Sequence, residues 1–435
     1  MNQLAWLALV SVGLSLILTP VFREIFRTFG VVDEPDHDRK IHKRAIPRGG
    51  GIALAVSYMV SLLVVRWFFG TGDEQFVLVA KVLPAACTIF AVGIIDDLWG
   101  LKPWQKLAGQ VMAAGIACSS GILSVDGTGF HGGAWWTVPA AILWLLFCTN
   151  GFNLIDGMDG LAAGAGMLAT LAILAAALLE KNTALAVATI PLAGCLLGFL
   201  RYNFSPATIF LGDSGSLLIG FLLGCYGIVW TEKSATLPGM AAPIMALSLP
   251  LVDVGLSVVR RFLSRQPIFM ADRGHIHHRL LDRGMSPKQA AMLLYGVCGA
   301  AAVFSFVEVA VHSNARSGAI ILVFCATAGI GLRYLGETGL SLAGRLLFAG
   351  GVQPDRPATR RLTALQKSIE DVKTAAVGIG LPAAGTGSFT VTTTGQFGLS
   401  PTHMLITDEV RWHAASHRPR SNRRRDWIER SAFPE

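Results

Sequence analysis

The sequence has few charged residues. Lysine, arginine, aspartate and glutamate make up 15% of its 435 residues, whereas an average soluble domain carries about 25%. Apolar runs close to 20 residues long recur along the first three quarters of the chain, and such runs are long enough to cross a bilayer as helices. The shortage of charge and the repeated runs exclude an ordinary soluble protein and indicate a multi-span membrane protein.

Cysteine is also scarce, with seven residues that all lie inside apolar runs and none at the spacing of metal ligands. This distribution excludes a disulfide scaffold and a cysteine zinc site, and it predicts small buried apolar side chains. The first apolar segment lacks a preceding positive charge and a following small-residue cleavage site. We therefore expect it to remain as a membrane span and not to act as a cleaved signal peptide.

The apolar pattern predicts an all-α integral membrane fold with about eleven transmembrane helices in residues 1–340. The remaining residues, 341–435, lack apolar spans and have the proline, glycine, threonine and arginine bias of a disordered cytoplasmic extension. The expected spans are 4–22, 50–69, 76–95, 104–124, 137–153, 158–179, 183–200, 208–230, 238–259, 291–311 and 317–335.

Basic residues are distributed unevenly between the two sets of loops. Up to residue 332, the side that holds residues 23–49 carries seventeen lysines and arginines, whereas the opposite side carries five. The positive-inside rule makes the basic side cytoplasmic. The net charge of +8 is thus a topology signal, with anionic lipid headgroups as a further partner, and it does not indicate nucleic-acid binding.

Four polar clusters interrupt the apolar pattern, and the predicted topology puts all of them on this cytoplasmic side. Ionisable groups at membrane depth are costly, so they are functional candidates by default. The clusters contain Asp96 and Asp97 in G-I-I-D-D-L-W-G-L, Asn150, Asn153, Asp156 and Asp159 in N-G-F-N-L-I-D-G-M-D-G-L-A, Asp213 in F-L-G-D-S-G-S, and His275, His277 and His278 in G-H-I-H-H-R-L-L.

These residue types favour phosphate chemistry assisted by a hard cation. Adjacent carboxylates such as Asp96 and Asp97 repel each other and need a cation or a lysine nearby. Oxygen ligands without cysteine favour Mg²⁺, with Mn²⁺ as an alternative, over Zn²⁺. The three histidines leave Zn²⁺ open as a less favoured alternative, because Arg273, Arg279 and Arg283 surround them and would repel a cation. The same mixture of arginine and histidine suits a diphosphate or a sugar phosphate.

The four clusters, together with V-D-E-P-D-H-D-R-K-I-H-K-R-A-I-P-R-G-G-G at residues 32–51, resemble the polyprenyl-phosphate N-acetylhexosamine-1-phosphate transferases. The resemblance covers about residues 1–340 and is closest to the bacterial enzymes that use undecaprenyl phosphate and UDP-N-acetylglucosamine. It implies an all-helical membrane enzyme that transfers the sugar 1-phosphate to the lipid phosphate and releases UMP.

The resemblance also implies roles for individual residues. It makes Asn153 and Asp213 ligands of Mg²⁺, and it places Asp96 and Asp97, with Asp156, at the catalytic centre. Further residues match positions that bind the nucleotide sugar, and a first cytoplasmic motif has a less defined role. The nucleotide-sugar positions are Lys106, Asp159, Phe210, His275, His277, His278 and Arg279, and the first motif contains Arg39, Lys40 and His42.

Four alternatives stay open from the sequence. The attack by the lipid phosphate is either direct or passes through a covalent aspartyl phosphate. The donor is UDP-N-acetylglucosamine or another UDP-N-acetylhexosamine, including the donor of phospho-MurNAc-pentapeptide transferase. A cation-coupled transporter is less favoured, because transporters place acidic groups near the midplane. The oligomeric state is also open, and the chain is either a monomer or a homodimer.

Overall fold

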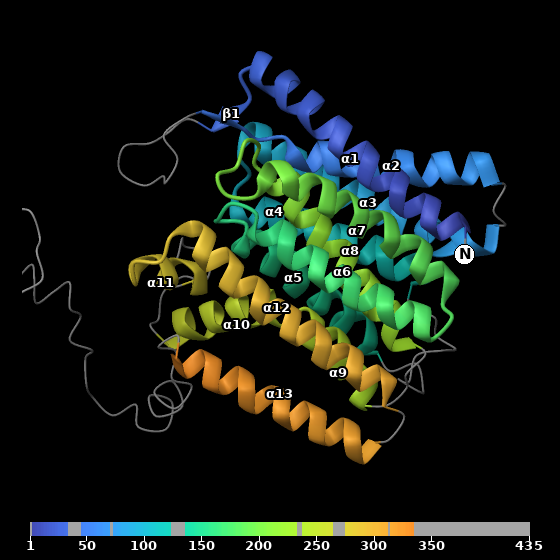
Figure 1. The fold of residues 1–435 in the computed structure, drawn as a ribbon, viewed down its shortest axis with the longest axis vertical. Helices are drawn as coiled ribbons and strands as arrows, with labels where there is room; N and C mark the ends of the chain where they lie inside the picture. The colour runs from blue at the N-terminus through green and yellow to red at the C-terminus, as the bar shows by residue number, and fades with distance from the viewer. Residues whose placement is uncertain are drawn as a thin grey trace, which may run out of the picture. The chain divides into compact units, whose positions relative to one another are not determined.

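The computed structural model describes residues 2–33, 45–69, 73–122, 135–232, 237–263, 275–311 and 314–334. Helices make up almost all of this part of the chain, and Figure 1 shows α1 to α8 lying side by side as a bundle. The elements are α1 (Asn2–Thr28), β1 (Val32–Asp33), β2 (Ile46–Pro47), α2 (Gly50–Phe69), α3 (Asp73–Trp99), α4 (Pro103–Ser119), α5 (Thr137–Ile155), α6 (Leu161–Leu179), α7 (Thr183–Asn203), α8 (Gly212–Glu232), α9 (Leu237–Ala246), α10 (Ser248–Leu263), α11 (Ile276–Asp282), α12 (Pro287–Ala310) and α13 (Asn314–Tyr334).

The all-α membrane fold predicted from the sequence is confirmed. Within the described residues, eight helices are long and apolar enough to cross a membrane, namely α1, α2, α3 and α5 to α8 with α12. Large apolar side chains such as Leu9, Trp67 and Leu322 are more than half exposed on helix surfaces, as expected where the solvent is lipid. The count of eleven spans stays a prediction. The predicted extension at 341–435 lies outside the described residues.

The ninth expected span, 238–259, is a broken helix. The helical hydrogen bonding of α9 ends at Ala246, and α10 begins at Ser248. Pro250 lies in the first turn of α10 and has no N–H to donate to the carbonyl of Ala246, so the backbone ladder is interrupted at this point. The break allows α10 to pack against α5 independently of α9, where the Pro250 carbonyl approaches Gly151.

Glycines allow α2, α3 and α8 to touch near one end of the bundle. A Cβ added to Gly93 of α3 would lie 2.5 Å from Ser214 Cα of α8, and a Cβ on Gly51 of α2 would lie 2.1 Å from the Gly215 nitrogen. Small residues at such crossings are the usual way in which membrane helices bring their backbones together. These contacts fix where α8 begins relative to α3.

Cysteines were expected to be buried, and this prediction is wrong for two of them. Cys148, Cys195, Cys225 and Cys298 are buried, but Cys87 and Cys325 are exposed. Both lie on apolar helices, where a weakly polar thiol can face lipid as easily as the helix interior. The described cysteines are free thiols.

A short antiparallel ribbon forms the two β-strands in the described ranges, and an isolated β-bridge joins Arg48 to Phe210 beside it. Val32 pairs with Pro47 and Asp33 with Ile46, which ties the residues after α1 to those before α2 (Figure 1). The backbone after β2 continues this pairing with the segment before α8, because Phe210 donates to the Pro47 carbonyl (2.9 Å), and Gly50 donates to the Phe210 carbonyl (2.9 Å).

We predict that Gly93→Ala destabilises the protein, whereas Gly115→Ala does not. The added methyl group at position 93 would meet the Ser214 backbone, but nothing lies within 4 Å of the corresponding position on Gly115. Overpacking of this kind costs about 1–3 kcal/mol, and alanine in an open helical position is slightly favourable. Thermal unfolding of the two purified variants in one detergent measures the difference, and equal melting temperatures would contradict the close α3–α8 contact.

Candidate active site

The described ends of several helices converge on a cavity of about 1670 Å³. Its walls come from the end of α1, both β-strands, the end of α3, the α5–α6 connection, the segment before α8 and α11. Seven of the site residues predicted from the sequence line it: Asp96, Asp97, Asp156, Asp159, Phe210, Asp213 and His278. The four polar clusters therefore meet at one end of the bundle.

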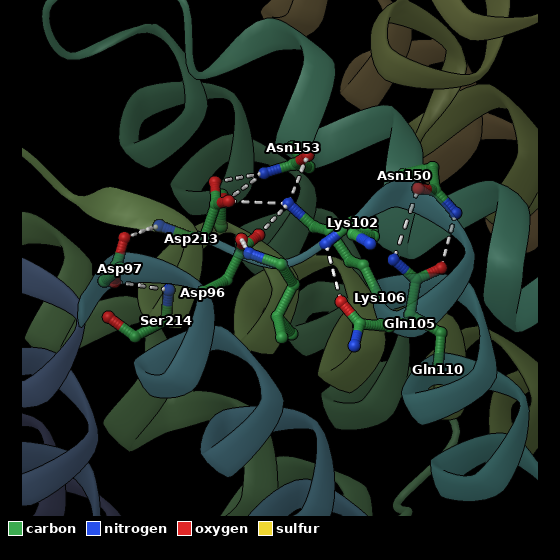
Figure 2. Close-up of polar contacts among 12 residues, drawn as sticks. Asp96, Asp97, Lys102, Gln105, Lys106, Gln110, Asn150, Asn153, Asp213 and Ser214 are labelled. Carbon is green, nitrogen blue, oxygen red and sulfur yellow. Dashed lines mark hydrogen bonds and ion pairs between the residues drawn. The ribbon is translucent and has the colours of Figure 1, made fainter. Parts of the chain in front are cut away.

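The ammonium group of Lys106 is the centre of the polar network (Figure 2). Its Nζ lies 2.6 Å from Asp213 Oδ2 and 2.8 Å from Asp96 Oδ2, and it donates to Asn153 Oδ1 at 3.1 Å. Asn153 in turn donates to Asp213 Oδ1 at 2.6 Å. One positive group from α4 thus joins oxygens from α3, α5 and α8, in a region where the side chains of Lys106 and Asp96 are only 16% and 10% exposed.

The oxygens around Lys106 have the chemistry of a hard-cation site. Two carboxylates and one amide oxygen surround the ammonium group, and carboxylate and amide oxygens are the protein ligands that Mg²⁺ takes. In the described part of the chain, no three His, Cys, Asp or Glu side chains are grouped as a metal site. A divalent ion here would accordingly need oxygens from a substrate in addition to those of Asn153 and Asp213.

Asp97 differs from its neighbour Asp96 in what it contacts. Its two carboxylate oxygens accept the backbone N–H groups of Asp213 (2.8 Å) and Ser214 (2.9 Å) at the start of α8. A carboxylate at a helix N-terminus is stabilised by the unpaired N–H groups and the helix dipole. Gly212 has φ of +74°, and a Cβ there would lie 2.8 Å from Asp97 Oδ2. Asp97 therefore fixes the backbone that carries Asp213.

Asp156 and Asp159 lie in the connection between α5 and α6. Burial, together with the nearby carboxylates of Asp213 and Asp97, raises the pKa of Asp156 well above its usual range. This carboxyl group lines the cavity beside the acidic network, so a proton or a cation is favoured next to it. Asp159 has a different contact, since its Oδ2 accepts the backbone N–H of Ala207 at 3.0 Å.

The segment from Ala207 to Ser214 is fixed at three points. Asp159 holds Ala207, the residues next to β2 hold the backbone of Phe210 and Leu211, and Asp97 holds Asp213 and Ser214. Phe210 lines the cavity within this segment, so its ring is presented from a backbone that is bonded on both sides.

The histidine motif forms a group of closely packed rings at the start of α11. The rings of His275 and His277 are nearly parallel, with centroids 5.9 Å apart, and those of His277 and His278 are 4.3 Å apart. Burial and the adjacent His278 lower the pKa of His277 to about 4, so this ring is neutral at pH 7. Of the three, His278 lines the cavity. Arg279 lies in α11, half-buried, one position further along the chain.

The first cytoplasmic motif predicted from the sequence, with Arg39, Lys40 and His42, lies outside the described residues.

Comparison with known proteins decides the family. The sequence model of glycosyl transferase family 4 matches residues 78–231, a range that contains every residue of the Lys106 network. A probable undecaprenyl-phosphate N-acetylglucosaminyl 1-phosphate transferase of Bacillus subtilis is 34% identical over 294 residues, which cover 66% of this chain and 80% of that protein. The chain belongs to the polyprenyl-phosphate N-acetylhexosamine-1-phosphate transferase family.

Two further relatives in this family are similar over comparable lengths. A decaprenyl-phosphate N-acetylglucosaminephosphotransferase of Mycobacterium tuberculosis is 32% identical over 338 residues, which cover 68% of this chain and 80% of the relative. The undecaprenyl-phosphate alpha-N-acetylglucosaminyl 1-phosphate transferase of Escherichia coli is 27% identical over 289 residues, which cover 62% of this chain and 75% of the relative.

Several residues at or beside the site of this transferase family member were not predicted from the sequence. Asp253 of α10 is 2% exposed and contacts the histidine motif. Gln110 was also missed. It forms a reciprocal pair of amide hydrogen bonds between α4 and α5 with Asn150 of the predicted second cluster (Figure 2), one helical turn from Lys106 and Asn153. Asp253 had a usable signal, since it is an acid inside an expected membrane span. Basic residues counted only for topology also line the cavity, namely Arg23, Arg27 and Arg48.

We predict that Lys106→Met lowers the melting temperature by several degrees in the presence of a chelator, and that added MgCl₂ restores much of the loss. Without the ammonium group, the carboxylates of Asp96 and Asp213 lose their shared counter-charge, and removing one partner of a buried ion pair is strongly destabilising. Lys102→Met is the matched control, because this side chain is exposed one turn earlier. Equal melting temperatures for the two variants in chelator would exclude Lys106 as the counter-charge.

Proposed function

We propose that this protein transfers N-acetylglucosamine 1-phosphate from UDP-N-acetylglucosamine to undecaprenyl phosphate and releases UMP, which starts a lipid-linked glycan of the cell envelope. The observation that carries the proposal is the junction of Asp96, Asn153, Asp213 and Lys106, because two of its members, Asp96 and Asp213, line a large cavity. This arrangement suits a diphosphate that is bound with a divalent cation. The names of the relatives support the same donor sugar and a polyprenyl-phosphate acceptor.

The proposed step exchanges one phosphoanhydride (P–O–P) bond for another. An oxygen of the lipid phosphate attacks the sugar-linked phosphorus of the donor and forms a new P–O–P bond. The original P–O–P bond breaks, and its electron pair leaves with the phosphate of UMP. A phosphate monoester has a second pKa near 6, so the acceptor is already largely dianionic at neutral pH and a strong general base is not required.

The residues of the cavity divide the remaining tasks. Mg²⁺ held by Asn153 and Asp213 would neutralise the negative charge that the two anionic substrates bring together. In this scheme Lys106 turns from the carboxylates to the donor's diphosphate, and Asp96 orients the acceptor. Phe210 stacks on the uracil ring, while Asp159 acts indirectly by holding Ala207 in the same segment. His278 and Arg279 bind the sugar-phosphate part.

We assign the cavity to the cytoplasmic side of a bacterial inner membrane. The distribution of basic residues supports this orientation, and Arg23, Arg27 and Arg48 at the cavity wall belong to the basic side. Arg23 and Arg27 pair with Glu24, and Arg48 pairs with Asp33 at the same wall. The three arginines therefore outnumber these two acids, which suits the approach of an anionic nucleotide sugar from the cytoplasm.

We do not expect the isoprenoid chain to lie in the apolar groove between α2, α3 and α8. A groove of about 260 Å³ lies between α2, α3 and α8 and is lined by residues such as Val79, Phe90 and Leu222. Along each of these helices, a close backbone contact separates the groove from the cavity. Gly93 meets Ser214, and Gly51 meets Gly215. We therefore expect the lipid chain to leave the cavity past other helices.

We predict that purified protein converts undecaprenyl phosphate and labelled UDP-N-acetylglucosamine to a lipid-linked product and UMP when Mg²⁺ is supplied. The two products are measured by thin-layer chromatography and by nucleotide analysis, and they should form in equal amounts. UDP-N-acetylgalactosamine and UDP-MurNAc-pentapeptide serve as competing donors in parallel. Absence of product from every donor, in a preparation that is folded by its melting curve, would rule out the proposed reaction.

We also predict that Asp213→Asn raises the Mg²⁺ concentration needed for half-maximal activity by about tenfold or more, because it removes a charged oxygen from the Lys106 network. Asp282→Asn is the control with the same chemical change on the exposed end of α11. Titration of initial rates with MgCl₂ measures the effect. A variant with the wild-type Mg²⁺ dependence would remove Asp213 from the cation site.

A further inference from the structure

An acidic residue that the reaction scheme does not use lies behind the histidine motif. Asp253 of α10 is 2% exposed, in a helix that belongs to an expected membrane span. Its Oδ1 accepts the backbone N–H of Ile276 at 2.9 Å, and its Oδ2 lies 2.9 Å from Nδ1 of His275. A buried carboxylate is costly unless it is paired and hydrogen-bonded, and both of its oxygens are engaged with the start of α11.

The contact with His275 fixes which ring nitrogen carries the hydrogen. A carboxylate only accepts hydrogen bonds, so Nδ1 of His275 must be the donor. The other nitrogen, Nε2, then has a lone pair when the ring is neutral and an N–H when the ring is protonated. Because His275 is itself only 4% exposed, Asp253 also supplies the counter-charge beside a ring that has little access to water.

The ring of His275 begins an array that ends at the cavity. His275 stacks on His277, His277 contacts His278, and His278 lines the cavity. Both ring nitrogens of His277 are buried and have no hydrogen-bond partner among the residues that the structure describes. A Cβ on Gly157, next to Asp156, would lie 2.8 Å from its Nε2. The array thus has Asp253 at its buried end, and it touches the α5–α6 connection.

We propose that Asp253 is a positioning residue for donor binding, which acts by fixing the orientation and the tautomer of His275 and, through the stacked rings, the position of His278 in the cavity. This inference rests on the proposed function. Asp253 would contribute to the affinity for the nucleotide sugar. It would not affect the binding of the lipid acceptor.

The alternative is that Asp253 only caps the first turn of α11. Asn separates the two roles. The side-chain oxygen of asparagine accepts hydrogen bonds as a carboxylate oxygen does, so Asp253→Asn keeps an oxygen for the Ile276 N–H. Its amide NH₂, however, is a donor that faces Nδ1 of His275 and would force the hydrogen onto Nε2. The variant therefore preserves the cap and reverses the hydrogen bond to the ring.

The experiment measures kcat and KM for both substrates in the full-length protein. We expect Asp253→Asn to raise the KM for UDP-N-acetylglucosamine about tenfold or more, to leave the KM for undecaprenyl phosphate within about twofold, and to keep the wild-type melting temperature. Asp282→Asn, at the exposed end of α11, should behave as wild type.

A double-mutant cycle tests the route of the effect. If Asp253 acts through the ring, Asp253→Asn should change the donor KM by less than about twofold in a His275→Ala background, because coupled residues are not additive. Wild-type kinetics for Asp253→Asn, an equal change in both KM values, or full additivity with His275→Ala would each overturn the proposal. A wild-type protein that forms no product from any UDP-N-acetylhexosamine would instead overturn the proposed function, and the inference with it.

Discussion

The arrangement of the site depends on one positive charge placed among acids. Lys106 extends from α4 to the carboxylates of Asp96 and Asp213 and to the amide of Asn153, so four helices share a single ammonium group. At this depth, uncompensated carboxylates would repel each other or take up protons. The Gln110–Asn150 pair one turn away holds α4 and α5 in register. Because of this register, Lys106 of α4 and Asn153 of α5 lie within hydrogen-bond distance of each other.

Much of this could be predicted from the sequence, because membrane solvent imposes strong rules on composition. The apolar runs predicted most of the long helices with errors of a few residues at their ends, although the ninth expected span is divided into α9 and α10. The cavity confirms that Asp96, Asp156 and Asp213 meet at one end of the bundle. This end-on position also separates the protein from a transporter, in which acids near the midplane would be expected.

Other features depend on contacts between distant helices that no local pattern encodes. Adjacent Asp96 and Asp97 look equivalent in the sequence, yet one joins the lysine and the other bonds the start of α8, because neighbouring residues on a helix point about 100° apart. Asp253 resembles an isolated acid in an apolar run until its partner His275, 22 residues later, is known. The exposure of Cys87 likewise follows from which face of α3 meets lipid.

The segment before α8 fixes the spacing between two of the proposed substrate-binding groups. Phe210 and Asp213 are three residues apart on a backbone that Asp159, the strand β2 and Asp97 hold in place. Their Cα atoms can be at most about 10 Å apart, whatever the rest of the protein does. In the proposed function, one end of this stretch meets the base and the other meets the cation. The backbone thus limits the distance between the group that binds the base and the group that binds the cation. Residues elsewhere in the cavity would determine which sugar is accepted.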